Sequence, residues 1–290
     1  MPRRFTKFHG FGNDYLVFEA AQLADVADLG NFAQRICDRH YGAGGDGIAV
    51  LSGPPALADG HKTDADFNVR IFNPDGSEAG MSGNGTRCAA AYLHYHGLWS
   101  EEHLRLDTRN GVKRYQLLER TPKGSFQFRS ELGLPRLDTA SIPMLTDTPL
   151  DQVTDYPLLV GDETIKVTAL QMGNPNCCIF VEDFDAIDWR RLGPLVENHP
   201  QFPERTNVIF IRVRDRGQID ERIWERGVGE TESSGTCSCA AVVAAVINGK
   251  TDRKVDVHAP GGLIPIEWRD DGEVVLTGSA DVVYAGEWLG

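Results

Sequence analysis

Two parts of the sequence resemble each other, and this internal repeat constrains the fold more than any other feature. The segment 70–73, Arg-Ile-Phe-Asn, matches the segment 222–225, Arg-Ile-Trp-Glu, in residue type at an offset of 152 positions. A second match joins Gly12-Asn13 to Gly173-Asn174. Because half of the 290-residue chain is long enough for one domain, we expect two copies of one folding unit. The first offset also pairs, without a gap, Glu78 with Glu230, Ser82 with Ser234, Gly83 with Gly235, Ala89 with Ala241 and Gly97 with Gly249.

The charge balance excludes several classes of partner. Lys and Arg total 29 and Asp and Glu total 42, which leaves a net charge of −13 with His neutral. Nucleic acids and anionic lipid surfaces reward clustered positive charge, so we expect no nucleic acid partner and no membrane partner. The sequence shows neither an apolar stretch behind its basic start nor a run of roughly 18 apolar residues. We therefore expect a cytoplasmic protein.

The cysteines indicate reduced thiols rather than disulfides or a metal centre. Six cysteines are too few for a disulfide framework in a chain of this length, and none forms a Cys-x-x-Cys pair. Cys177 and Cys178 are adjacent, which is a poor arrangement for chelating one ion. His94 and His96 would face different ways on a helix. We expect no metal site.

Local signals predict an α+β fold with a similar arrangement in each copy. Apolar runs at 68–72 and 207–213 are typical of strands. Ala-rich segments at 88–95 and 239–247 favour helices that end at Gly97 and Gly249. Asn110-Gly111, Gly261-Gly262 and Asp271-Gly272 indicate hairpins beyond the helices. The segment 120–138, rich in Gly and Pro, is expected to contain the crossing between the halves.

Each predicted helix begins with a Ser-Gly motif, which is a candidate anion site. The first backbone N–H groups of a helix have no partner within it, and they lie at the positive end of its dipole. Two such helix starts in two similar domains could bind one carboxylate. Ser is also a preferred N-cap, so each motif taken alone is equally explained as a cap. The two motifs are Ser82-Gly83-Asn84 and Ser234-Gly235-Thr236.

A set of polar residues in both copies points to a zwitterionic ligand. Asparagine is depleted from strands, yet four asparagines stand beside a glycine or within segments that otherwise indicate strands: Asn13, Asn73, Asn174 and Asn207. Each one taken singly is better explained as a turn or edge residue. As a set, the amides and Arg226 would suit a carboxylate, and Glu225 would suit an ammonium group.

Five sequence motifs, spread in order over essentially the whole chain, resemble those of the diaminopimelate epimerase family. They occupy residues 8–14, 72–78, 83–87, 172–175 and 225–231. The resemblance implies two pseudo-symmetric α+β domains, each a β-barrel-like sheet around a central helix. The domains implied are residues 1–130 with 278–290, and residues 131–277. It also implies a small amino-acid substrate and no cofactor. The oligomeric state is left open, with a homodimer among the alternatives.

The same resemblance implies a reaction and the residues that perform it. Family members invert an amino-acid α-carbon with two cysteines, one removing the proton as a thiolate and the other returning it as a thiol. The positions that match the family's distal substrate contacts are Asn13, Asn73, Asn174, Asn207 and Arg226, and Glu225 matches the ammonium acceptor. The positions that match the donors to the reacting carboxylate are Gly83, Asn84, Gly235 and Thr236.

Three positions depart from the family pattern at the catalytic centre. Ser82 and Ser234 stand where the family has cysteines, and Asn176 stands where it has a histidine. A thiol ionises near pH 8.5, whereas an unassisted hydroxyl stays protonated, so serine needs an adjacent base. Cys237 follows Ser234 by three positions and is the one thiol with the spacing to replace it, without a counterpart near Ser82.

The residues leave three functions open. The main hypothesis is an isomerase of the diaminopimelate epimerase type, converting LL- to meso-diaminopimelate with Ser82, Ser234, Glu225 and Asn176 at the catalytic positions, whether the serine pair is natural or engineered. The second is an enzyme of the same superfamily with another chemistry, such as dehydration or isomerisation. The third is a protein that binds a diamino-dicarboxylate without turning it over.

Overall fold

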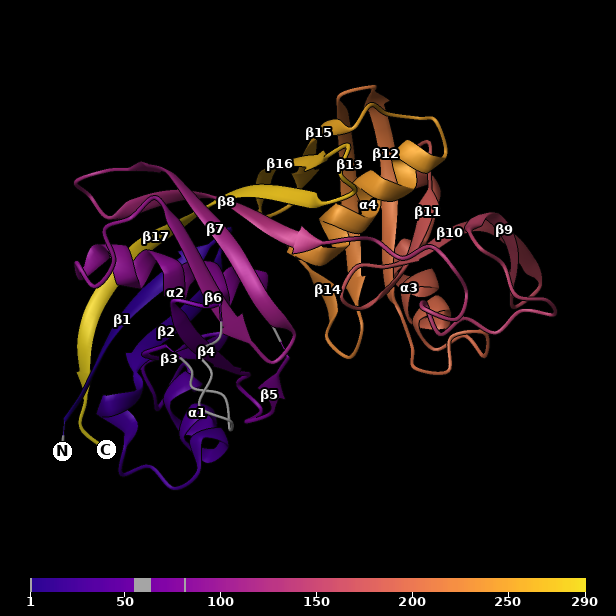
Figure 1. Ribbon diagram of the computed structural model, residues 1–290. Helices are drawn as coiled ribbons and strands as arrows, with labels where there is room; N and C mark the ends of the chain where they lie inside the picture. The colour runs from indigo at the N-terminus through magenta and orange to yellow at the C-terminus, as the bar shows by residue number, and fades with distance from the viewer. Residues whose placement is uncertain (1, 55–63, 81) are drawn as a thin grey trace. The chain divides into compact units, whose positions relative to one another are not determined.

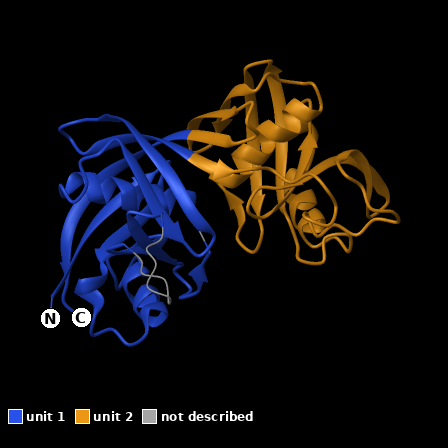
Figure 2. Cartoon of the chain, in the orientation of Figure 1, with its two compact units in different colours: residues 1–130, 277–290 blue, residues 131–276 orange. Residues whose placement is uncertain are grey.

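The computed structural model describes residues 2–54, 64–80 and 82–290. The chain forms two compact units, one of residues 1–130 with 277–290 and the other of residues 131–276 (Figure 2). It passes from one unit to the other twice, within strand β8 (Ser125–Gly133) and within strand β17 (Val274–Trp288). Within the described ranges, no helix combines the length and apolar character that crossing a bilayer requires.

The first unit is a closed ring of eight strands around a central helix, α2 (Gly83–Tyr95) (Figure 1). Each strand pairs with the next in the order β1, β2, β3, β4, β6, β7, β8 and β17, and β17 pairs again with β1. The strands not yet given are β1 (Arg3–Gly10), β2 (Asn13–Glu19), β3 (Gly47–Ser52), β4 (Phe67–Phe72), β6 (His103–Thr108) and β7 (Gly111–Arg120). Outside the ring lie η1 (Ala20–Leu23), α1 (Leu29–Cys37) and the short β5 (Glu78–Ala79).

The second unit wraps a curved sheet around helix α4 (Gly235–Ile247). Its pairing order is β9, β10, β11, β12, β13, β15, β16 and the start of β17. The bounds are β9 (Val153–Val160), β10 (Glu163–Gln171), β11 (Pro175–Phe180), β12 (Asn207–Asp215), β13 (Gln218–Glu225), β15 (Lys254–Ala259) and β16 (Gly262–Trp268). The remaining elements are η2 (Phe184–Ala186), α3 (Trp189–Glu197) and β14 (Gly229–Thr231).

The repeat in the sequence reappears in the strand pairing. Phe72 pairs with Glu78 between β4 and β5, and Trp224 pairs with Glu230 between β13 and β14, again 152 positions apart. Each unit also has a parallel pair whose strands are connected through a surface helix, β2 with β3 through α1 and β11 with β12 through α3. The predicted α+β class with two similar barrel-like units is confirmed.

Both predicted helices are present. Helix α2 begins five residues before its Ala-rich segment, and α4 begins four residues before its own. Ser82 and Ser234 are the N-cap residues, with extended backbone, so the helices start at Gly83 and Gly235. Most residues of each helix are buried, because a helix enclosed by a sheet must be apolar on nearly all sides. After α2 the N–H of Leu98 donates to the carbonyl of Leu93, a bond that closes the helix end.

The predicted hairpins are also present. Gly111, with φ +83°, stands at the turn between β6 and β7, and Gly262 and Gly272 have positive φ at the later turns. The sequence did not locate α1 and α3. Both are nine-residue helices, and α3 contains Pro194, which weakens the helix signal.

Candidate functional site

The hydroxyl of Ser82 is tied to the start of α2 and to strand β2. Its Oγ accepts a hydrogen bond from the N–H of Gly85 at 3.1 Å, so Ser82 is a capping residue as well as a candidate for chemistry. The phenol oxygen of Tyr15 lies 2.8 Å from the same Oγ, and either oxygen can donate. A Cβ on Gly85 would lie 2.9 Å from the Tyr15 ring, so the absence of a side chain there lets Tyr15 approach the helix.

The hydroxyl of Ser234 has different surroundings, although Ser234 is the equivalent N-cap. Among the residues that the structure describes, none gives it a capping bond from α4. Glu225 from the end of β13 is its acidic neighbour. Burial raises the pKa of Glu225, and the hydroxyls of Thr231 and Ser234 partly offset that rise. Ser234 is therefore the serine with a carboxyl group beside it.

Cys237 does not offer a substitute thiolate. It follows Ser234 on α4 and is fully buried. Burial raises the pKa of its thiol well above the ordinary value, and the negative charge of Glu225 adds to this effect. All six cysteines lie within the described ranges, and each is free and buried.

In the first unit, Asn13 and Asn84 lie side by side and are oriented by charged groups. Asn84 Nδ2 donates to Asn13 Oδ1 at 3.1 Å, and Asn13 Nδ2 donates to Asp46 Oδ2 at 2.9 Å. Arg87, one turn further along α2, donates from Nη2 to Asn84 Oδ1 and from Nε to the carbonyl of Ser279. These bonds leave each amide a single orientation, as a binding site for a polar ligand needs.

Asn73 stands apart from this pair. Its Nδ2 donates to Ser77 Oγ at 2.9 Å, and its backbone N–H donates to the carbonyl of Ser77. It therefore closes the turn between β4 and β5. This is the turn role that asparagine commonly has, and the bonds of Asn73 link it to neither Asn13 nor Asn84.

In the second unit, four predicted site residues form one hydrogen-bonded chain. Asn176 Nδ2 donates to the Oδ1 of Asn174 at 3.1 Å, and Asn207 Nδ2 donates to Asn176 Oδ1 at 3.1 Å. Asn207 Oδ1 in turn accepts from the backbone N–H of Arg226 at 2.9 Å. Asn174 also reaches Thr236 on α4, with Nδ2 3.4 Å from Oγ1. Asn176, fully buried, uses both amide atoms to hold its neighbours.

Glu197 at the end of α3 holds the segment that carries Glu225 and Arg226. Its two carboxylate oxygens accept from Trp224 Nε1 and from the N–H of Gly227, both at 2.8 Å. Arg226 Nη1 donates to the carbonyl of Glu204 at 2.9 Å. Burial of the Glu197 carboxylate makes these bonds strong, so the segment is rigid.

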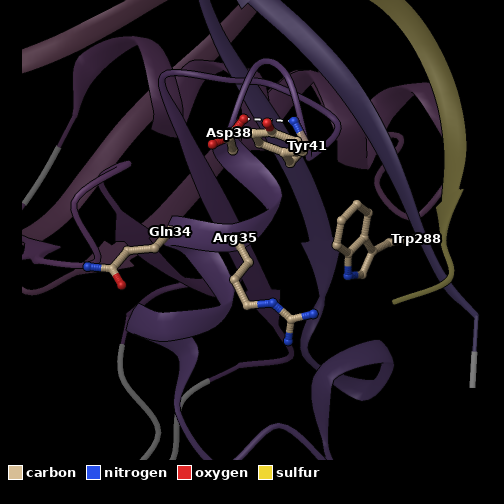
Figure 3. Close-up of a pocket in the computed structure, with 5 residues that line it drawn as sticks. All are labelled: Gln34, Arg35, Asp38, Tyr41 and Trp288. Atoms are coloured by element: carbon tan, nitrogen blue, oxygen red, sulfur yellow. Dashed lines mark hydrogen bonds between the residues drawn. The ribbon is translucent and has the colours of Figure 1, made fainter.

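A hollow of about 390 Å³ on the first unit contains none of the predicted site residues (Figure 3). It is lined by Gln34, Arg35, Asp38, Tyr41 and Trp288. In this view Asp38 and Tyr41 lie together at the top, and the Arg35 side chain lies between Gln34 at the left and Trp288 at the right. The described part of the chain contains no group of three His, Cys, Asp or Glu residues able to hold a metal ion.

Sequence reasoning missed three residues that contact the helix starts. Nothing in the sequence indicated that Tyr15 contacts Ser82, because the two residues are 67 positions apart and Tyr15 belongs to an apolar strand. Thr86 and Ser238, each four residues after an N-cap serine, donate to the carbonyl of that serine at 2.7 Å and 3.0 Å. The offset of 152 also relates Thr86 to Ser238, and this signal was available in the sequence.

The fold falls in a class known from solved racemases. A structure of a probable proline racemase from Agrobacterium radiobacter matches 99% of this chain and 92% of its own length, with a TM-score of 0.66 and 15% sequence identity. At that identity the likeness concerns the fold.

The particular family follows from the sequence comparisons. The family model of diaminopimelate epimerase matches residues 5–133 and 168–283. A diaminopimelate epimerase of Pelotomaculum thermopropionicum is 43% identical over 286 residues, 98% of each chain. One of Desulforudis audaxviator is 42% identical over 286 residues, 98% of this chain and 99% of its own. The chain belongs to the diaminopimelate epimerase family, as its motifs predicted.

Proposed function

We propose that this protein is an isomerase that converts LL-diaminopimelate to meso-diaminopimelate without a cofactor, a step toward lysine and peptidoglycan precursors. The observation that carries the proposal is the duplicated helix start, in which Ser82 and Ser234 occupy the N-cap positions of the two central helices in a chain of the diaminopimelate epimerase family. An inversion needs one proton donor and one proton acceptor, and a duplicated unit supplies two equivalent positions.

The substrate would be held by its charged groups. The backbone N–H groups at Gly83, Asn84, Gly235 and Thr236 begin the two helices and suit the carboxylate at the reacting carbon. The ordered amides of Asn13, Asn174 and Asn207, together with Arg226, suit the distal carboxylate and ammonium. Asn176 supports this set by holding Asn174 and Asn207.

The proton transfer would use Ser234 with Glu225 and Ser82 with Tyr15. Ser234 Oγ takes the α-proton while its own hydroxyl proton passes to the carboxylate of Glu225, and the C–H electron pair stays on the α-carbon. Burial raises the pKa of Glu225, which makes it a better base than an ordinary carboxylate. The Ser82 hydroxyl gives a proton to the carbon, and Tyr15 donates to the resulting alkoxide. Water then restores the proton of Ser82 and removes the one on Glu225.

Proton NMR in D2O tests the proposal with LL- and meso-diaminopimelate. The expected result is loss of the α-proton signal together with a change in the ratio of stereoisomers, and no such change with Ser234→Ala. Saturation-transfer signals in the same tubes report binding separately. Binding without exchange would contradict the proposed reaction and would support a binding protein.

A further inference from the structure

Glu221 is a fully buried acidic residue on β13 that the proposed reaction does not use. Its carboxyl Oε1 lies 2.5 Å from Ser238 Oγ, and within the described residues its Oε2 is buried without a hydrogen-bond partner. The guanidinium of Arg222 lies over the Phe184 ring, 4.6 Å from its centroid, and donates from Nη1 to the backbone carbonyl of Glu221. A buried carboxylate with one oxygen unbonded and no direct ion pair is costly, so the neutral acid is favoured.

The hydrogen bonds of Ser238 provide a second, geometric reason. Ser238 Oγ lies within reach of two acceptors, Glu221 Oε1 and the carbonyl of Ser234 at 3.0 Å. A hydroxyl carries one hydrogen and can donate to one of them. Both contacts are hydrogen bonds when the O–H of a protonated Glu221 donates to Ser238 Oγ, because the Ser238 hydroxyl is then free to donate to Ser234.

The first unit contains the same arrangement with a different donor. Thr86 is equivalent to Ser238 and donates to the carbonyl of Ser82 at 2.7 Å. Tyr115 Oη, from β7, lies 2.5 Å from Thr86 Oγ1, the same separation as that of Glu221 Oε1 from Ser238 Oγ. Burial raises the pKa of Tyr115 to about 12, so its phenol keeps its proton throughout the neutral range. A protonated Glu221 reproduces this relay.

We propose that Glu221, as a neutral carboxylic acid, is a positioning residue of the Ser234 helix start and holds the serine through Ser238. The effect on catalysis rests on the proposed function, whereas the protonation and the relay do not. When Glu221 ionises, its carboxylate accepts the hydrogen bond from the Ser238 hydroxyl. The carbonyl of Ser234 then keeps only the hydrogen bond from the backbone N–H of Ser238. The helix start of the second unit is then less firmly held, and that of the first is unchanged.

The pH range follows from the surroundings of Glu221. Burial raises its pKa to about 8, and Ser238 and the positive charge of Arg222 oppose the rise. The other titratable groups that interact with it are thiols, Cys178 on β11 and Cys237 and Cys239 on α4. Its neighbour Asp220 points to the other face of the strand, where it pairs with Arg212 and Arg214 from β12 and is in register with His258 of β15.

The experiment compares the wild-type protein with Glu221→Gln, which keeps the shape and donates to Ser238 at every pH. Infrared difference spectra should show a protonated carboxyl band that the variant lacks and that disappears with a midpoint near pH 8. Amide hydrogen exchange in the first turn of α4, corrected for its intrinsic pH dependence, should rise above that midpoint in the wild type alone. Tyr115→Phe is the matched control, since it should leave both signals unchanged.

Turnover gives the remaining readout. Above the midpoint, kcat for α-proton exchange should fall in the wild type relative to Glu221→Gln, with KM unchanged. Ser238→Ala should lower kcat about fivefold at every pH by removing one hydrogen bond to Ser234. The proposal would be overturned if the infrared difference spectrum lacked the carboxyl band. It would also be overturned if kcat fell equally at alkaline pH in the wild type and in Glu221→Gln. A wild type without exchange at any pH contradicts the proposed function instead, and the infrared and amide data still decide the state of Glu221.

Discussion

The phenol oxygen of Tyr15 lies 2.8 Å from the hydroxyl oxygen of Ser82, so a strand of the first unit reaches the N-cap of that unit's central helix. The equivalent serine of the second unit has an acidic neighbour, Glu225, instead. Two positions related by an internal repeat therefore have unlike proton chemistry. This asymmetry suits a reaction in which one serine accepts a proton and the other donates one.

Tyr15→Phe removes one partner of Ser82 and leaves the ring in place. We expect α-proton exchange to slow by roughly tenfold, because the alkoxide left on Ser82 loses a hydrogen-bond donor. The measurement is exchange from LL-diaminopimelate followed by NMR. Tyr41→Phe, at an exposed tyrosine, serves as the control. An unchanged rate would show that Tyr15 has no part in the transfer.

Ser82→Cys combined with Ser234→Cys should accelerate exchange by about a hundredfold or more. A thiol at a helix start ionises far more readily than a hydroxyl, and a positioned acid or base contributes on the order of 10² to 10⁴ in rate. Steady-state rates of the double variant and of each single variant measure the effect. If the double variant gains nothing, the serines do not limit the rate.

Arg226→Ala should weaken binding of diaminopimelate by roughly ten- to a hundredfold, since a charge-assisted hydrogen bond to a carboxylate is lost. Titration calorimetry with LL-diaminopimelate measures the affinity. Arg216→Ala, which removes an exposed ion pair with Asp252 in the same unit, should leave it unchanged. Equal affinities of Arg226→Ala and the wild type would remove Arg226 from the site.

Asp14 should make the stability of the first unit depend on pH in the acidic range. Burial alone would raise its pKa, but hydrogen bonds from Arg39 and Lys7 lower it from 3.8 to about 2. Its contribution is therefore full above about pH 3.8 and is lost as the pH falls through about 2.

Asp14→Asn should lower the free energy of unfolding by about 2 kcal/mol at neutral pH, and the difference should shrink toward pH 2. Urea titrations at several pH values measure it. Asp25→Asn, at an exposed ion pair with Arg3, should have a much smaller effect. A difference that stays constant with pH would contradict the assignment.

The sequence predicted the class of fold because its signals are local and repeated. The offset of 152 relates Phe72 to Trp224, and the strand pairing preserves it. The Ala-rich segments gave the two central helices, and Gly111 gave a hairpin. Helices α1 and α3 were not predicted, since each is short and is stabilised by packing on strands rather than by helix propensity.

The site divides in the same way. The family motifs singled out Asn174, Asn176, Asn207 and Arg226, which the structure joins in one hydrogen-bonded chain. The partners of the two serines, Tyr15 and Glu225, lie on strands and meet the helix starts only in the folded chain. In the sequence they look like ordinary strand residues. A tyrosine in an apolar strand gives no indication of which hydroxyl it will meet.

By itself, the sequence determined the repeat, the α+β class, the family and the serine at the start of each central helix. Tertiary structure alone decided that Tyr15 meets Ser82, that Glu225 accompanies Ser234, and that Cys237 is too deeply buried to replace a thiolate. The physical reason is that periodicity and turn chemistry act over a few neighbouring residues, whereas burial and hydrogen-bond partners depend on segments far apart in the chain.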